Sequence, residues 1–180
     1  PCPFRELEPA MAKKKIQKLL VANRGEIALR VMRSARKMGI KTVAVYSEAD
    51  RNAPFVRFAD EAVCIGPAAS KESYLVFDKI IKVCTDLKVD GVHPGYGFLS
   101  ENGDFARALE KAGVIFVGPS PHAMKVMGDK LAAKEAVKGH GVPLVPGTEG
   151  AVSGLDEAMK VAKSISFPIL IKAAAGGGGK

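Results

Sequence analysis

The sequence has no tryptophan, only three cysteines and no hydrophobic run of the length that spans a membrane. Cys2, Cys64 and Cys84 are far apart and odd in number, so neither a disulfide framework nor a cysteine zinc site is expected. A secretory hydrophobic segment is also missing. These absences predict a soluble globular protein of a reducing compartment, with no membrane partner and no metal site.

Acidic residues are nearly absent from one stretch of the chain. Residues 11–41 contain ten Lys or Arg and a single acid, Glu26, whereas the remainder after residue 41 contains sixteen basic and sixteen acidic residues. The net charge of +8 therefore describes a local surface. Helical spacing places Arg30, Arg33 and Lys37 in one basic stripe. Because aromatic residues are not interleaved with this stripe, nucleic-acid binding is not expected.

Short apolar runs alternate with helical patterns over the first two thirds of the chain. Such alternation with short connections predicts right-handed βαβ units and a parallel sheet. We therefore predict an α/β, Rossmann-like sheet of five strands with helices on both faces, which is complete by residues 119–128. Strands are predicted at 18–23, 41–47, 61–66, briefly from Gly91, and at 114–118, and helices at 24–38, 74–87 and 102–111.

The remaining residues predict a second, incomplete unit. Helices are predicted at 122–127, 129–139 and 155–165, an extended connection at 141–147, and a last strand at 167–172. Too few residues follow to build the rest of a sheet around that strand. The expected organisation is a disordered or non-native lead-in at 1–15, an α/β domain at 16–127 and the beginning of another domain at 128–180.

The first βαβ unit invites comparison with dinucleotide-binding folds. Its second strand is followed by Glu48 and Asp50, and an acid at this position can hold a ribose. The first turn, residues 22–26, contains one glycine where the dinucleotide fingerprint needs three. Dinucleotide binding is therefore disfavoured.

Residues 91–102 place reactive side chains at the carboxyl edge of the predicted sheet, where doubly wound folds bind ligands. His93, Tyr96 and Glu101 lie on this rim, and Ser100 is the predicted N-cap of the next helix. Each rim residue also has a structural interpretation. His93 suits a hydrogen-bonded structural role, Tyr96 suits packing, and Glu101 suits the N-terminus of a helix. Composition leaves these alternatives open.

A run of glycines follows the last predicted strand and its Lys172. The run consists of Gly176, Gly177, Gly178 and Gly179. Glycine lets successive backbone N–H groups point at one phosphate, and a lysine adds a positive charge. A flexible linker is the alternative. The strand that carries Lys172 favours the phosphate loop, because a linker does not need such a strand.

Four segments of the chain together resemble one family. They are Val21–Arg30 (VANRGEIALR), His93–Asn102 (HPGYGFLSEN), Met127–Lys130 (MGDK) and Ile171–Lys180 (IKAAAGGGGK). In this order they resemble the N-terminal region of biotin carboxylase, the module of acetyl-CoA, propionyl-CoA, methylcrotonyl-CoA and pyruvate carboxylases. The resemblance implies a pre-ATP-grasp domain followed by the beginning of an ATP-grasp domain.

The resemblance also implies an enzyme. In this family ATP and bicarbonate give carboxyphosphate, with Mg²⁺ required, and the carboxyl group passes to biotin. By matching position, Lys130 and Lys172 contact ATP phosphates, and Gly176–Gly179 form a mobile loop over them. The residues implied to border the biotin and bicarbonate end of the pocket are His93, Tyr96 and Glu101.

The implied partners are the biotin carboxyl carrier domain, the carboxyltransferase and a second copy of the chain. In bacterial members the helix that matches Arg30 and Arg33 helps to form a homodimer. Lys37 stands where some members carry an acid, so a solvated face or a different neighbour is the alternative. The expected location is the cytoplasm, or the mitochondrial matrix for a eukaryotic carboxylase.

The family's magnesium carboxylates, bicarbonate-binding arginine and general base follow the glycine loop. The resemblance therefore implies an N-terminal fragment with an incomplete catalytic set, which we expect not to turn over ATP alone. Two other functions are alternatives: another ATP-grasp ligase, such as a carbamoyl-phosphate synthetase, or a non-catalytic docking module. Segments 21–30 and 93–102 fit biotin carboxylases better than other ATP-grasp ligases, and the basic stripe motivates the docking module.

Overall fold

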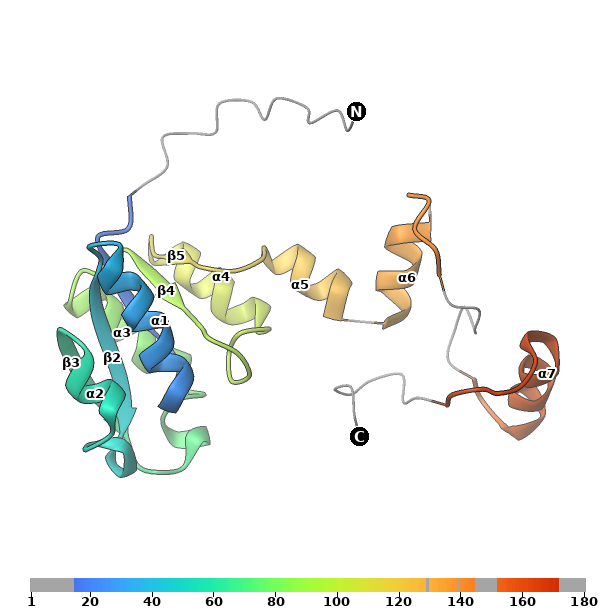
Figure 1. Cartoon of the computed structure of the whole chain (residues 1–180), viewed down its shortest axis with the longest axis horizontal. Coiled ribbons are helices and arrows are strands. Elements are labelled where there is room, and N and C mark those ends of the chain that lie inside the picture. The colour runs from blue at the N-terminus through green and yellow to red at the C-terminus, as the bar shows by residue number, and fades with distance from the viewer. Residues whose placement is uncertain (1–14, 129, 139, 145–151, 172–180) are drawn as a thin grey trace. The chain divides into compact units, whose positions relative to one another are not determined.

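The computed structural model describes residues 15–128, 130–138, 140–144 and 152–171. The chain separates into two compact units, Pro1–Pro119 and Ser120–Lys180, and each is described by itself (Figure 1). Among the described residues, no helix is both long and apolar enough to cross a lipid bilayer. Most of the predicted lead-in at 1–15 lies outside the described residues.

A five-stranded sheet forms the centre of the first unit, and all its neighbouring strands are parallel. Its order is β3-β2-β1-β4-β5, which confirms the predicted α/β fold class. Strand order reverses between β1 and β4, and this position in an open α/β sheet is where ligands bind. The strands are β1 (Lys18–Val21), β2 (Lys41–Ser47), β3 (Glu61–Gly66), β4 (Gly91–His93) and β5 (Ile115–Phe116).

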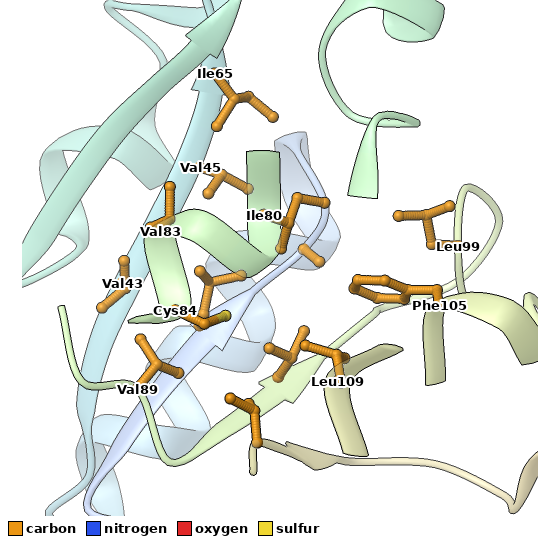
Figure 2. Packing of buried hydrophobic residues seen from close by; sticks show 14 of the residues in the cluster. Val43, Val45, Ile65, Ile80, Val83, Cys84, Val89, Leu99, Phe105 and Leu109 are labelled. Atoms are coloured by element: carbon orange, nitrogen blue, oxygen red, sulfur yellow. The ribbon is translucent and has the colours of Figure 1, made fainter. Parts of the chain in front are cut away.

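Side chains alternate across the sheet, so β1 and β2 each contribute to two hydrophobic cores. On one face Leu19 and Val21 pack with α1 (Gly25–Lys37) and with Phe55 of α2 (Pro54–Phe58). On the other face the cluster includes Leu20, α3 (Phe77–Asp86) and α4 (Gly103–Lys111). Figure 2 shows this second cluster, with labelled residues Val43, Val45, Ile65, Ile80, Val83, Cys84, Val89, Leu99, Phe105 and Leu109. Helices therefore cover both faces, as the alternating sequence pattern predicted.

Two local predictions were wrong in the first unit, and one element was missed. The helix predicted from Tyr74 begins at Phe77, because Tyr74 turns its side chain into the core and bonds to other loops. The N-cap of α4 is Asn102 and not Ser100, since the Asn102 side chain accepts a 2.9 Å hydrogen bond from the Phe105 amide. The short helix α2 was not predicted, although Pro54 occupies its first turn, where proline is favoured.

The described part of the second unit consists of α5 (Pro121–Gly128), α6 (Lys130–Lys138) and α7 (Leu155–Ile165). The strand predicted at 167–172 is not formed over its described residues, 167–171. A strand needs an edge partner for its backbone groups, and the described part of this unit contains no other strand. Leu170 and Ile171 consequently stand 77% and 84% exposed.

Candidate functional site

The loops after β1 and β4 meet at the carboxyl edge of the sheet, because Val21 pairs with His93 in the parallel register. Asn23 follows β1 and is buried. Its Nδ2 donates 2.8 Å hydrogen bonds to the carbonyl oxygens of both Pro94 and Tyr96. Its Oδ1 accepts a 2.9 Å bond from the Arg24 amide. One amide side chain thus joins the two loops at the point where strand order reverses.

Glycines allow the loop after β4 to approach this close to Asn23. Gly95 has φ +67°, and a Cβ there would lie 2.7 Å from Asn23 Nδ2. Both the left-handed backbone and the lack of space require glycine at this position. Gly97 has φ +63° with no atom within 4 Å of an added Cβ, so only its backbone conformation favours glycine. The sequence signal of a glycine-bracketed loop therefore has a steric cause.

A buried carboxylate connects the loops after β1, β2 and β3. Arg24 pairs with Asp50 through two bonds, Nε to Oδ2 at 2.7 Å and Nη2 to Oδ1 at 2.5 Å. Asp50 Oδ2 also accepts from the Tyr74 hydroxyl at 2.6 Å and from Ser47 Oγ at 3.2 Å. These bonds, above all those from Arg24, hold the pKa of Asp50 below its ordinary value. Burial, aided by Asp50, raises the pKa of Tyr74 to about 12.

Both oxygens of Asp50 are therefore occupied by protein donors. An acid at the end of the second strand of a dinucleotide-binding fold would have to accept bonds from a ribose. Asp50 is instead 7% exposed and bonded to three side chains. Its role in this fold is to hold neighbouring loops together.

A second attachment holds the loop after β4 through an aromatic pair. The Tyr74 and Phe98 rings are stacked, with centroids 5.2 Å apart and an interplanar angle of 6°. Phe98 has φ +41°, a left-handed conformation that is unfavourable for a residue with a Cβ. Residues 94–98 are thus fixed at one end by Asn23 and at the other by Tyr74.

The predicted rim residues have different environments. His93 is half-buried, its Nδ1 accepts a 3.0 Å hydrogen bond from the Gly95 amide, and burial lowers the pKa of its imidazole. It is therefore neutral at pH 7, with its proton on Nε2. Tyr96 is 65% exposed although its carbonyl is held by Asn23. Glu101 is exposed in the turn before α4. The loop thus carries both Tyr96 and Glu101 on its accessible surface.

Only one of the predicted ATP-contacting residues lies within the described part of the chain. Lys130 is the first residue of α6, and its side chain is outside what the structure describes. Lys172 and Gly176, Gly177, Gly178 and Gly179 lie outside the described residues altogether. Within the described ranges there is no group of three or more His, Cys, Asp or Glu side chains that could hold a metal ion.

The basic stripe lies on the exposed side of α1. Arg30, Arg33 and Lys37 are all exposed, and none forms an ion pair with an acid among the described residues. Their neighbour Arg36 differs, because its guanidinium lies 3.8 Å from the centroid of the Phe58 ring and donates to the Phe58 carbonyl. The stripe is therefore an exposed cationic surface on α1.

A family model described as biotin carboxylase, N-terminal domain, matches residues 15–124. The chain belongs to the biotin carboxylase family. A second model, described as carbamoyl-phosphate synthase L chain, ATP binding domain, matches residues 129–180. The first match contains the Asn23 contact, the Asp50 network and the loop after β4, so the interactions described above belong to a biotin carboxylase N-terminal domain.

Curated relatives and solved structures agree with this assignment. Biotin carboxylase 1 of Bacillus subtilis is 55% identical over 165 residues, which cover 92% of this chain and 37% of the relative. The mitochondrial propionyl-CoA carboxylase alpha chain of Sus scrofa is 52% identical over 167 residues, which cover 93% and 23%. The chain thus spans less than half the length of these relatives.

Two biotin carboxylase structures have the same fold over most of this chain. The Campylobacter jejuni biotin carboxylase complex with β,γ-ATP has a TM-score of 0.87 and 48% identity, covering 92% of this chain and 37% of that one. The biotin carboxylase domain dimer of Hydrogenobacter thermophilus 2-oxoglutarate carboxylase, in complex with MgADP, ADP and bicarbonate, has a TM-score of 0.84 and 46% identity. It covers 93% of this chain and 37% of that one.

Proposed function

We propose that this chain contributes to an ATP-dependent biotin carboxylase, which uses bicarbonate to carboxylate biotin on a carrier domain. We assign residues 16–127 to its pre-ATP-grasp domain and residues 128–180 to the beginning of its ATP-grasp domain. The observation that carries the proposal is the loop after β4, which Asn23 holds at the switch point of the sheet while Tyr96 and Glu101 remain accessible.

The loop residues divide into those that face a ligand and those that shape the loop. We assign Tyr96 and Glu101 to the biotin and bicarbonate end of the pocket, since both side chains are exposed. His93 borders this region, but its Nδ1 is occupied by the Gly95 amide. Its role is therefore to shape the turn, and we assign it no proton transfer.

ATP is a substrate in the proposed reaction, and the donor set suits it chemically. Lys130, Lys172 and Gly176–Gly179 combine ammonium groups with glycine amides, which together bind phosphate oxygens and stabilise charge on a transferring phosphoryl group. We assign them that role. Magnesium, when bound, would neutralise the phosphate charge. No described residues form a cluster for it, and we assign its ligands to other parts of the enzyme.

The proposed partners are a biotin carboxyl carrier domain, a carboxyltransferase and a second copy of the chain that meets α1. In a two-fold dimer the same patch faces itself, so the stripe of Arg30, Arg33 and Lys37 would bring like charges together unless acids from elsewhere lie between them. We expect weak, salt-dependent self-association for this reason. For location we propose the cytoplasm, or the mitochondrial matrix in a eukaryote.

A chimera tests the proposed function. This chain would replace the matching N-terminal region of Bacillus subtilis biotin carboxylase 1, and bicarbonate-dependent ADP release would be measured with and without biotin. We expect ADP release that the double variant Lys130→Ala, Lys172→Ala abolishes. A folded chimera that releases no more ADP than this double variant would refute the proposal. The 180-residue chain alone is expected to match its own double variant.

A further inference from the structure

The two attachments of the loop after β4 both start from neighbouring residues after β1. Asn23 bonds directly to the Pro94 and Tyr96 carbonyls. Arg24 acts through a relay, in which it pairs with Asp50, Asp50 accepts from Tyr74, and Tyr74 stacks on Phe98. Asn23 and Arg24, which are adjacent in the sequence, therefore hold the two ends of the segment that contains Tyr96.

We propose that Arg24, Asp50 and Tyr74 are positioning residues, which hold Phe98 and thereby fix the loop that presents Tyr96 and Glu101 to substrate. The ordering of the loop is a property of the fold alone. Its consequence for catalysis rests on the proposed biotin carboxylase function.

Tyr74 is well suited to fix the position of a neighbouring ring. It is 1% exposed, its hydroxyl donates a 2.6 Å bond to a carboxylate, and the same oxygen accepts a 3.0 Å bond from the Ser47 amide. Charge-assisted bonds of this length are strong and directional. The phenol ring consequently has one orientation, and it offers a flat face to the Phe98 ring.

Phe98 needs such support because of its backbone. At φ +41° a phenylalanine persists only where its surroundings hold it, and its side chain is 36% exposed. The stacked Tyr74 ring is the aromatic contact that the structure gives to Phe98. Loss of this contact should release the left-handed conformation at residue 98 and, with it, the turn from Gly97 to Asn102.

The relay residues cannot themselves exchange protons with a substrate. The Asp50 oxygens are filled by Arg24, Ser47 and Tyr74, and the Tyr74 hydroxyl is occupied on both its donor and acceptor sides. They act through the loop and not at the reacting atoms, which distinguishes them from catalytic residues.

Hydrogen exchange of the full chain tests the relay without any need for activity. The reporters are the amides of Ser100 and Asn102, which bond to the Gly97 and Leu99 carbonyls, compared with the Leu20 amide in the sheet. Phe98→Leu should raise the exchange rate of the two loop amides about tenfold relative to that of Leu20. The reason is that loss of the stacking interaction with Tyr74 should raise the equilibrium constant for opening of the loop by about that factor. Unchanged loop exchange in this variant would overturn the proposal.

Two further variants separate the relay from general stability. Tyr74→Leu should resemble Phe98→Leu, and Tyr74→Phe, which keeps the ring but loses the bond to Asp50, should give about a threefold rise. Phe55→Leu is the matched control, because Phe55 is an equally buried aromatic residue on the opposite face of the sheet. It should change exchange at the loop and at Leu20 by the same factor. A selective rise at the loop in this control would also overturn the proposal.

Kinetics of the chimera test the consequence for catalysis. Phe98→Leu should lower kcat/KM for biotin about tenfold and leave the KM for ATP unchanged. A rise in the KM for ATP as large as the fall in kcat/KM for biotin would overturn the positioning role. An inactive parent chimera would refute the proposed function, whereas the hydrogen-exchange result would still decide whether the relay orders the loop.

Discussion

The two units of the chain bury their apolar residues to different degrees. In the first unit every strand has a helix or a second strand against it, and Leu20, Met32 and Phe105 are fully buried. In the second unit α7 exposes 77% of Leu155 and 45% of Met159. Both units have amphipathic helices, but among the residues that the structure describes only the first unit has a sheet to cover them.

This difference shows what a helix needs in order to be stable. Most helical stability in proteins comes from packing of the apolar face and not from intrinsic propensity. α1 has a sheet beneath it, whereas the described part of the second unit has helices and no strand. Exposed apolar side chains on one face of a helix are available to pack against another element. The relatives are long enough to supply such structure, since this chain covers 37% of Bacillus subtilis biotin carboxylase 1.

The largest expected effect compares one leucine from each unit. Leu20→Ala should lower the free energy of unfolding of the first unit by about 3 kcal/mol, because it deletes a fully buried side chain. Leu155→Ala should change stability by less than about 0.5 kcal/mol, because that leucine is mostly exposed. Urea unfolding followed by circular dichroism measures both, and equal losses would break the comparison.

Removal of the charge at Asp50 should have the next largest effect. Asp50→Asn should lower the free energy of unfolding by about 2 kcal/mol. This loss is smaller than for a fully buried ion pair, because Arg24 is half exposed to water. Because the pKa of Asp50 is lower in the folded than in the unfolded state, ionised Asp50 stabilises the fold at pH values above its unfolded pKa of about 4. This stability is lost as pH falls from there through the folded pKa. The stability difference between wild type and variant should therefore shrink as pH falls below about 4, and a difference that stays constant would contradict the role of charge.

The Tyr74 hydroxyl should have a smaller effect and a clear optical signal. Tyr74→Phe should cost about 1 kcal/mol, because the bond to Asp50 is lost while the ring remains. The pKa of Tyr74 is raised to about 12, so this contribution is present below pH 10 and decreases as pH rises through 12. The chain has three tyrosines, and ultraviolet titration should show one late ionisation that the variant lacks. Loss of an early ionisation instead would show that Tyr74 is accessible.

The smallest effect is expected on the basic stripe. Arg33→Gln should alter stability by less than about 0.5 kcal/mol, since Arg33 is exposed and lacks an ion pair among the described residues. Arg36→Gln should cost more, because Arg36 lies over Phe58 and bonds to its carbonyl. Thermal unfolding of the two variants gives the comparison. A larger loss for Arg33 would indicate that the stripe is covered in solution.

Local patterns in the sequence were sufficient to predict most of the first unit. The strands at 41–47 and 61–66 have the predicted bounds, and the helix predicted at 24–38 forms at Gly25–Lys37. The helix follows from its periodicity, because one face is buried, whereas β2 follows from a continuous apolar run that is buried on both faces. The strand predicted at 167–172 was wrong over 167–171, since a strand also depends on a partner that local pattern does not supply.

The candidate site was predictable only in part. The glycine-bracketed loop at 91–102 indicated the carboxyl edge of the sheet as the candidate site. The resemblance to biotin carboxylases then indicated Tyr96 and Glu101 within this loop. The relay from Arg24 through Asp50 to Tyr74 was missed, because it joins residues 24 and 26 positions apart whose pairing appears only in the tertiary fold. Asp50 was noticed as an acid at a strand end, but its partners could not be identified from the sequence.

The central claim is that the first unit is a complete domain that holds the candidate loop without help from residues 120–180. Residues 15–119 expressed alone test it most directly by hydrogen exchange. We predict cooperative unfolding and the same protection at the Ser100 and Asn102 amides as in the full chain. A molten polypeptide, or a loop that loses its protection while the sheet remains protected, would contradict the account.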